Sequence, residues 1–233
     1  MPMLGAVLTP HPPVLLPEVG QGREREIAAT GQAMCAAAAE VARWNPDVLV
    51  VASPHTILYG DYFQIAPGRS AVGDMSAFGA PQVRIEARYD APLRQEIIRW
   101  AGDAGLKAGT LGQRDPQLDH GVLIPLYFLR KAGVDCPIVR VGLSGFSPLA
   151  HYQLGRCIAE AAETLGRRAV FVASGDLSHK LRPDGPYGFA PEGPVFDEAV
   201  TGAMASGDFL QFLTMDPSLC ERAAECGLRS FQM

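Results

Sequence analysis

The sequence predicts an α/β fold, with a single domain built on a central, mostly parallel or mixed sheet that has helices on both faces. Apolar runs of strand length alternate with helical patterns over most of the 233 residues, which is the order that builds a sheet covered by helices. Hydrophobic residues make up 48% of the chain, enough for a sizeable core. The chain shows no internal repeat, linker or low-complexity segment, so we expect residues 1–233 to form one domain.

In the first half of the chain, strand patterns outnumber helical ones. "PDVLVVAS" (46–53) is apolar throughout, which is typical of a strand buried on both faces, whereas "QVRIEARYD" (82–90) alternates apolar and polar residues, which is typical of a strand with one wet face. A helix with a dense alanine face is expected at 24–43. Further strands are expected at 4–8 and, within a long Gly-rich loop at 54–81, at 62–65.

In the second half of the chain, strand and helix patterns alternate more regularly. Asp90 is positioned to cap the first of its helices. "RPDGPYGFAPEGP" (182–194) is a loop by its Pro and Gly content, and residues 195–233 are helical in short pieces. The other expected elements are helices at 91–104, 121–132 and 148–165 and strands at 106–111, 136–144 and 168–174.

Composition excludes several classes of function. The formal net charge is -5 and no basic run occurs, so nothing favours binding to nucleic acid. No stretch has the length of a membrane span, and the N-terminal apolar run is too short for a signal peptide. The five cysteines are odd in number and lack CxxC spacing, which favours a reduced, cytoplasmic protein.

The end of the sequence is unusual. "ECGLRSFQM" stops within an amphipathic helical pattern that has neither a cap nor a polar tail. We therefore expect the domain to be truncated at Met233, with more chain beyond it in the native protein.

Four of the five histidines occupy similar places in the predicted fold. His11, His55 and His179 each follow a strand, and His120 lies in a turn that leads into a helix. Because the carboxyl ends of parallel strands meet at one edge of a sheet, these four rings are expected to surround one cleft. His151 alone lies within a helix, where a surface or capping role is expected.

Neutral imidazoles gathered in a cleft suit a divalent first-row metal. Two histidines and a carboxylate on one face would hold non-haem Fe(II) with open positions, whereas zinc with a bound water would make a hydrolytic site. Both interpretations need another ligand, and "CERAAECG" offers Glu221, Glu225 and Cys226. The two glutamates are one helical turn apart and would share a face.

Four motifs together resemble the class III extradiol dioxygenase superfamily, which includes the protocatechuate 4,5-dioxygenase catalytic subunit and the Memo-like proteins. The motifs are "TPHPP", "SPH", "LDHG" and "SGDLSH", in that order, spanning residues 9–179. "ECGLRS" is similar to the last metal-ligand segment of a branch in which this domain can be joined to an AMMECR1-type domain.

The resemblance implies a metal site for Fe(II), with zinc or copper as alternatives. His11 and His55 match the two iron-binding histidines of the family. The third ligand is a glutamate in the dioxygenases, for which Glu225 is the best match, and a cysteine in Memo-like proteins, which would select Cys226. The sequence carries both side by side, and Glu225 is the expected third ligand, with Cys226 as the alternative, because a carboxylate would complete the facial triad of an Fe(II) site.

The resemblance also implies roles in catalysis. His179 matches the proposed acid–base catalyst and His120 the histidine that contacts a substrate oxygen. Asp176 is expected near the substrate, and it is a departure from the dioxygenases toward the Memo-like pattern. The implied reaction is the opening of a catechol-type aromatic diol by O2, in which His179 takes a hydroxyl proton and returns it to oxygen.

Two other functions fit the same residues. One is a Memo-like protein that binds iron or copper for redox or signalling without ring cleavage, and the other is a zinc hydrolase. Neither a glycine-rich phosphate loop nor a GxSxG motif occurs, which disfavours nucleotide-dependent and serine-esterase chemistry. A homo-oligomer and a fused or separate AMMECR1-type partner domain stay open.

Overall fold

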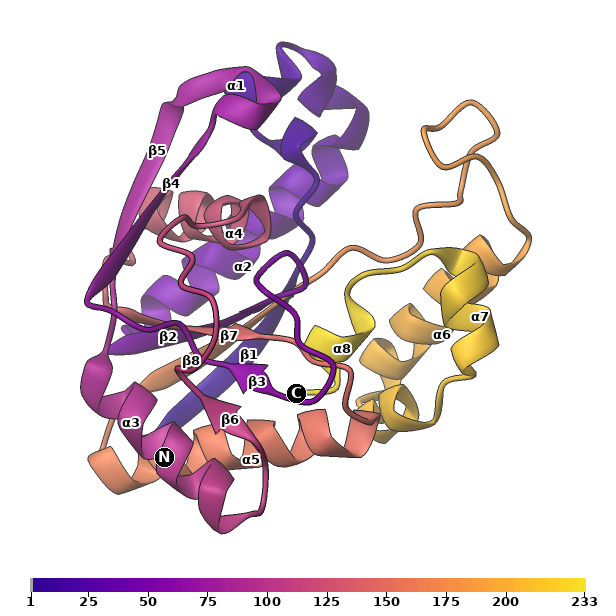
Figure 1. Cartoon of the computed structure of the whole chain (residues 1–233). Helices are drawn as coiled ribbons and strands as arrows, with labels where there is room; N and C mark the ends of the chain where they lie inside the picture. The colour runs from indigo at the N-terminus through magenta and orange to yellow at the C-terminus, as the bar shows by residue number, and fades with distance from the viewer. Residues whose placement is uncertain (1) are drawn as a thin grey trace.

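Four parallel strands form the central sheet of the computed structural model, which describes residues 2–233. They are β1 (Met3–Thr9), β2 (Val48–Ser53), β7 (Ile138–Gly142) and β8 (Ala169–Ser174), in the spatial order β1-β8-β2-β7. Each neighbouring pair is parallel, so their carboxyl ends lie along one edge. The predicted α/β fold with a mostly parallel sheet is confirmed (Figure 1).

Alternate residues of the buried strands face two separate apolar layers. In β2, Leu49 and Val51 pack on one face of the sheet, and Val50 and Ala52 pack on the other, as the two-residue period of a strand requires. The first layer is completed by α2 and α4 and the second by α3 and α5. These helices are α2 (Ala28–Trp44), α3 (Ala91–Asp103), α4 (His120–Lys131) and α5 (Pro148–Leu165).

The C-terminal segments form a third apolar cluster beside the sheet, drawn in orange and yellow in Figure 1. Phe196, Val200, Phe212 and Leu228 are its core, and α8 packs next to β8. The remaining elements are η1 (Pro13–Leu15), α1 (Pro17–Gly20), η2 (Arg23–Ile27), β3 (Phe63–Gln64), η3 (Ser76–Phe78), β6 (Ala108–Gly109), α6 (Glu192–Ser206), η4 (Phe209–Thr214), α7 (Pro217–Ala223) and α8 (Leu228–Phe231).

A β-hairpin occupies part of the region that the sequence assigned to a long loop. β4 (Ser70–Met75) pairs antiparallel with β5 (Ala80–Arg88). The apolar alternation of β4 is broken by Gly73 and Asp74, which hides the strand from a pattern search. Gly73 is needed for packing, because a Cβ there would lie 2.4 Å from the carbonyl oxygen of Leu118. The strands expected at 62–65 and 106–111 shrink to the two-residue pair β3 and β6.

His151 is a core residue, and its expected surface or capping role is wrong. The side chain is 0% exposed, at the start of α5. Its Nδ1 lies 3.0 Å from the carbonyl oxygen of Ser147, and its Nε2 accepts the backbone N–H of Ser144 at 3.4 Å. A neutral ring with the proton on Nδ1 satisfies both contacts, whereas a protonated ring would direct an N–H at another N–H.

This burial makes His151 a source of acid sensitivity. Burial lowers its pKa from 6.5 to about 4, so the unfolded chain takes up the proton first and stability is lost as pH falls from about 6.5 to 4. The free energy of unfolding should therefore fall less between pH 6.5 and 4 in His151→Gln than in the wild type, by up to about 3 kcal/mol. Urea unfolding of both proteins at several pH values measures it, and parallel curves would contradict it.

No helix within residues 2–233 is both long enough and apolar enough to cross a membrane.

Candidate active site

Three strands of the central sheet are each followed, two residues after the strand ends, by a polar side chain of the site. His11 lies two residues after β1, His55 two residues after β2, and Asp176 two residues after β8. His179 follows three residues later, and His120 begins α4. The structure therefore brings the four predicted site histidines together at the carboxyl edge of the sheet, with His151 elsewhere.

Hydrogen bonds fix the tautomer of His11, which is buried at 1% exposure. The hydroxyl of Ser174 donates its one proton to the carbonyl oxygen of Gly121 at 2.5 Å. It must therefore accept from Nδ1–H of His11, 2.9 Å away. The lone pair of a neutral His11 ring is thus on Nε2, the atom that faces His55.

His55 is held by a network centred on Asp119. Ser53 donates to one oxygen of Asp119 at 2.6 Å and Thr56 to the other at 2.8 Å, so both flanks of His55 are tied to one carboxylate. Asp119 also caps α4 by accepting the N–H of Val122. His55 Nε2 lies 3.0 Å from His11 Nε2.

His120 completes the group from the first turn of α4. Its ring centroid lies 4.1 Å from that of His55 and 5.3 Å from that of His11. The next residue, Gly121, permits this approach, because a Cβ there would lie 2.4 Å from the hydroxyl of Ser53.

His179 is linked to the other histidines through Asp176, whose carboxylate lies near both His11 and His179. Nδ1 of His179 lies 2.5 Å from the carbonyl oxygen of Ala224, and Nε2 lies 3.7 Å from Asp176 Oδ2. Since a carbonyl only accepts, a neutral His179 ring carries its proton on Nδ1 and leaves Nε2 free to take one. Asp176 is itself fixed, because Oδ1 accepts the backbone N–H of His11 at 2.7 Å while Oδ2 lies 3.8 Å from His11 Nε2.

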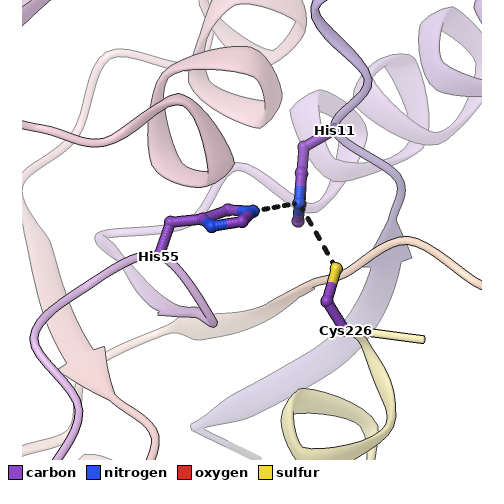
Figure 2. A group of neighbouring side chains, drawn as sticks. All are labelled: His11, His55 and Cys226. Atoms are coloured by element: carbon purple, nitrogen blue, oxygen red, sulfur yellow. Dashed lines mark hydrogen bonds between the residues drawn. The ribbon is translucent and has the colours of Figure 1, made fainter. Parts of the chain in front are cut away.

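Cys226 reaches the histidines from the C-terminal part of the chain. Its Sγ lies 3.7 Å from His11 Nε2, and Figure 2 shows His11, His55 and Cys226 pointing toward one another. The loop after β8 and the segment before α8 touch at Gly175 and Gly227, where a Cβ on Gly175 would lie 2.0 Å from the Cα of Gly227. This glycine contact allows Cys226 to reach the end of the sheet.

The glutamates of the same segment are placed differently. The carboxylate of Glu225 accepts the N–H of Leu228 at 2.7 Å, at the start of α8. Glu221 is an exposed residue of α7. The two do not share a helix face as expected, because α7 ends at Ala223 and Ala224 adopts a left-handed conformation with φ 52°. Glu225 as metal ligand stays a prediction.

Burial keeps the clustered imidazoles neutral. It lowers the pKa of His11 to about 4, and it also lowers the pKa of His55 and of His120. Asp176 acts in the opposite direction on His179, whose pKa is raised. Burial favours the neutral form of Asp176, but His179 and His11 outweigh this and lower its pKa.

These residues fit a divalent metal. Among the described residues, ligand atoms of His11, His55 and Cys226 lie within 4.8 Å of one another, as do those of Asp176, His179 and Cys226. Nitrogen and sulfur ligands at about 2.1–2.3 Å from one ion are roughly 3.0–3.6 Å apart, close to the 3.0 and 3.7 Å measured from His11. Burial raises the pKa of Cys226 to about 12, so its thiol would lose its proton only to a bound cation.

Sequence reasoning missed two residues that hold the histidines in place. Asp119 directs the loop of His55, and its signal was present, since Asp just before a helix is a common N-cap. Ser174 sets the tautomer of His11, but an apolar run ending in serine carries no such signal.

The chain matches the model of a known protein family over nearly its whole length. Residues 5–233 match the model of the catalytic LigB subunit of aromatic ring-opening dioxygenase. The chain belongs to this family. The resemblance that the four histidine motifs predicted is therefore confirmed.

Curated relatives differ in what their names state. A Clostridium acetobutylicum protein whose name gives no activity is 33% identical over 99% of this chain and 51% of its own length. The 2,3-dihydroxyphenylpropionate/2,3-dihydroxicinnamic acid 1,2-dioxygenase of Escherichia coli is 29% identical over 60% of this chain and 46% of its own length. An enzyme of the same name, numbered 1, from Pseudomonas putida is 28% identical over 66% and 50%. The chain thus spans about half the length of the curated relatives it matches.

One solved structure is similar at a lower level. It is an uncharacterized protein from Escherichia coli K12, with a TM-score of 0.47, 20% identity, and coverage of 80% of this chain and 75% of that one.

Proposed function

We propose that this protein is an Fe(II)-dependent extradiol dioxygenase that opens the ring of a catechol-type aromatic diol. The observation that supports it most is the spacing of His11 and His55, whose Nε2 atoms are 3.0 Å apart at the carboxyl edge of the sheet. His11 and His55 would hold the metal, with Cys226, Asp176 or Glu225 as candidates for the third ligand. Two neutral imidazoles and one further ligand leave open positions for substrate and dioxygen.

Bound iron would bring the diol and dioxygen together and pass electron density from the ring to oxygen. One ring C–C bond beside the diol breaks and both oxygen atoms enter the product, so no external reductant is needed. The protein would supply proton transfer: Nε2 of His179 takes a hydroxyl proton of the diol and returns it to oxygen, while Ala224 and Asp176 orient the ring. His120, beside His55, would contact a substrate oxygen.

The test is metal analysis of anaerobically purified protein, followed by reaction of Fe(II)-loaded protein with catechol and with dihydroxyphenylpropionate. We expect one O2 consumed per diol and a new visible absorption from the ring-opened product. Zinc-loaded protein is the control and should leave the diol intact. Stoichiometric iron without O2 consumption, for either diol, would contradict the proposal.

A second candidate is favoured by one observation, the thiol of Cys226 at 3.7 Å from His11 Nε2. A thiolate suits softer metals than a carboxylate does, which supports a metal-binding redox or signalling protein without ring cleavage. Copper bound more tightly than iron, together with inert catechols, would favour it. A zinc hydrolase would instead copurify with zinc and cleave esters or amides.

The third ligand can be identified by paired variants. We expect Cys226→Ala to weaken metal binding more than the roughly 10–100-fold that loss of an outer-shell partner costs, because Sγ belongs to the close group of ligand atoms. Glu225→Gln should retain the metal, since an amide oxygen can still accept the N–H of Leu228. Isothermal titration of both variants with metal measures this. A loss with Cys226→Ala alone fits both candidate functions, which the O2 assay separates, and the reverse result would select Glu225.

A further inference from the structure

Seven side chains form an unbroken row of contacts across the site. The row runs in the order Phe78, His120, His55, His11, Asp176, His179, Tyr187. Its centre holds the candidate metal ligands, and each end is an aromatic ring. The ring of Phe78 lies 5.2 Å from that of His120, and the ring of Tyr187 lies 4.9 Å from that of His179.

The two aromatic rings belong to two separate connecting segments of the chain, and both are partly exposed to solvent. Phe78 ends η3 in the turn between β4 and β5 and is 38% exposed. Tyr187 lies in the loop between β8 and α6, the orange loop that projects from the body of the molecule in Figure 1, and is 60% exposed. A backbone bridge between Leu181 and Phe189 closes the base of this loop, so Tyr187 sits on a defined turn.

We propose that Phe78 and Tyr187 bind the ring of the aromatic substrate and thereby set its position over the metal. This inference rests on the proposed function. The two oxygens of a diol would be directed toward the polar centre of the row, so its ring carbons need apolar contact from the flanks. Aromatic rings attract one another at centroid distances of about 4.5–7 Å, and these two already lie within that range of His120 and His179, the histidines assigned to substrate and proton transfer.

The test measures binding apart from turnover. Nitrocatechol is titrated anaerobically into Fe(II)-loaded protein, and its absorption shift gives Kd. We expect Phe78→Ala and Tyr187→Ala each to raise Kd by about 2- to 12-fold, the fold-change that matches ~0.5–1.5 kcal/mol for an aromatic contact. With catechol, KM should rise more than kcat falls. Metal content should stay unchanged.

Matched variants separate ring contact from other effects. Phe78→Tyr and Tyr187→Phe keep the rings and should restore Kd. Phe209→Ala removes a ring of similar exposure, 54%, that lies beside Phe212 in η4, and it should leave Kd unchanged.

The outcomes distinguish this inference from the proposed function. If wild-type protein binds iron but not nitrocatechol, the proposed function fails and the inference with it. If wild-type protein binds nitrocatechol and both alanine variants bind it equally well, the inference alone is wrong. A fall in kcat with unchanged Kd would also overturn it, because Tyr187 would then act through His179.

Discussion

His55→Ala and His11→Ala should each abolish stoichiometric metal binding. An open site with three protein ligands loses most of its affinity with one of them, more than the roughly 10–100-fold cost of losing an outer-shell contact. The Nε2 atoms of both residues lie at the centre of the candidate site. Metal content by mass spectrometry and affinity by titration with Fe(II) measure the loss.

The two variants should differ in stability, which provides an internal control. His55 packs one side against His11 and His120, and this burial lowers its pKa, but the rest of its side chain is exposed to solvent. Its removal therefore leaves no enclosed cavity and should cost less than about 0.5 kcal/mol. His11 is 1% exposed and bonded to Ser174, so its removal should cost about 1–3 kcal/mol. Full metal content in a folded His55→Ala protein would exclude it as a ligand.

His179→Ala should retain the metal and lose turnover. In the proposed function this ring acts on the substrate and not on the metal; its Nδ1 lies against the carbonyl oxygen of Ala224 and its Nε2 faces Asp176. Removal of a general acid–base group typically costs about 10²–10⁴-fold in rate, and we expect kcat for ring opening to fall within that range. Rapid mixing of anaerobic enzyme–catechol complex with O2 measures the step directly.

The control for this variant is His151→Gln, which changes a histidine outside the site and should leave kcat unchanged at neutral pH. If His179→Ala loses the metal, His179 is a ligand and its expected catalytic role is wrong. If kcat is unchanged, the proton is carried by another group.

The fold was predictable because its strands are strongly patterned. β2 and β8 are apolar throughout, and both were found within two residues of their ends. β4 was not, since Gly73 and Asp74 interrupt its alternation and its packing partner, Leu118, is distant in sequence. His151 was misplaced for a related reason: the carbonyl oxygen and N–H that hold a neutral ring in the core come from backbone atoms, which leave no mark in a side-chain pattern.

The site was predictable to the level of its histidines and less so beyond them. The parallel-strand argument located His11, His55 and His179, because strand ends can be read from sequence. The sequence argument placed Glu225 ahead of Cys226, whereas in the structure it is Cys226 whose Sγ lies near His11. Adjacent residues point in different directions, and the backbone turn at Ala224, with its left-handed conformation, leaves no mark in the residue pattern. The exposed rings of Phe78 and Tyr187 were not singled out either, because their loops give no periodic signal.

The contact between His11 and Cys226 joins residues 215 positions apart. An ion bound by both side chains would cross-link the segment after β1 to the segment before α8, and so close a loop that contains most of the chain. Closing so long a loop removes much of the configurational freedom of the unfolded chain, and binding to the native state alone adds RT ln(1 + [L]/Kd) to its stability. Melting temperature should therefore report metal occupancy, and chelation should first loosen the C-terminal cluster around Phe212 and Leu228.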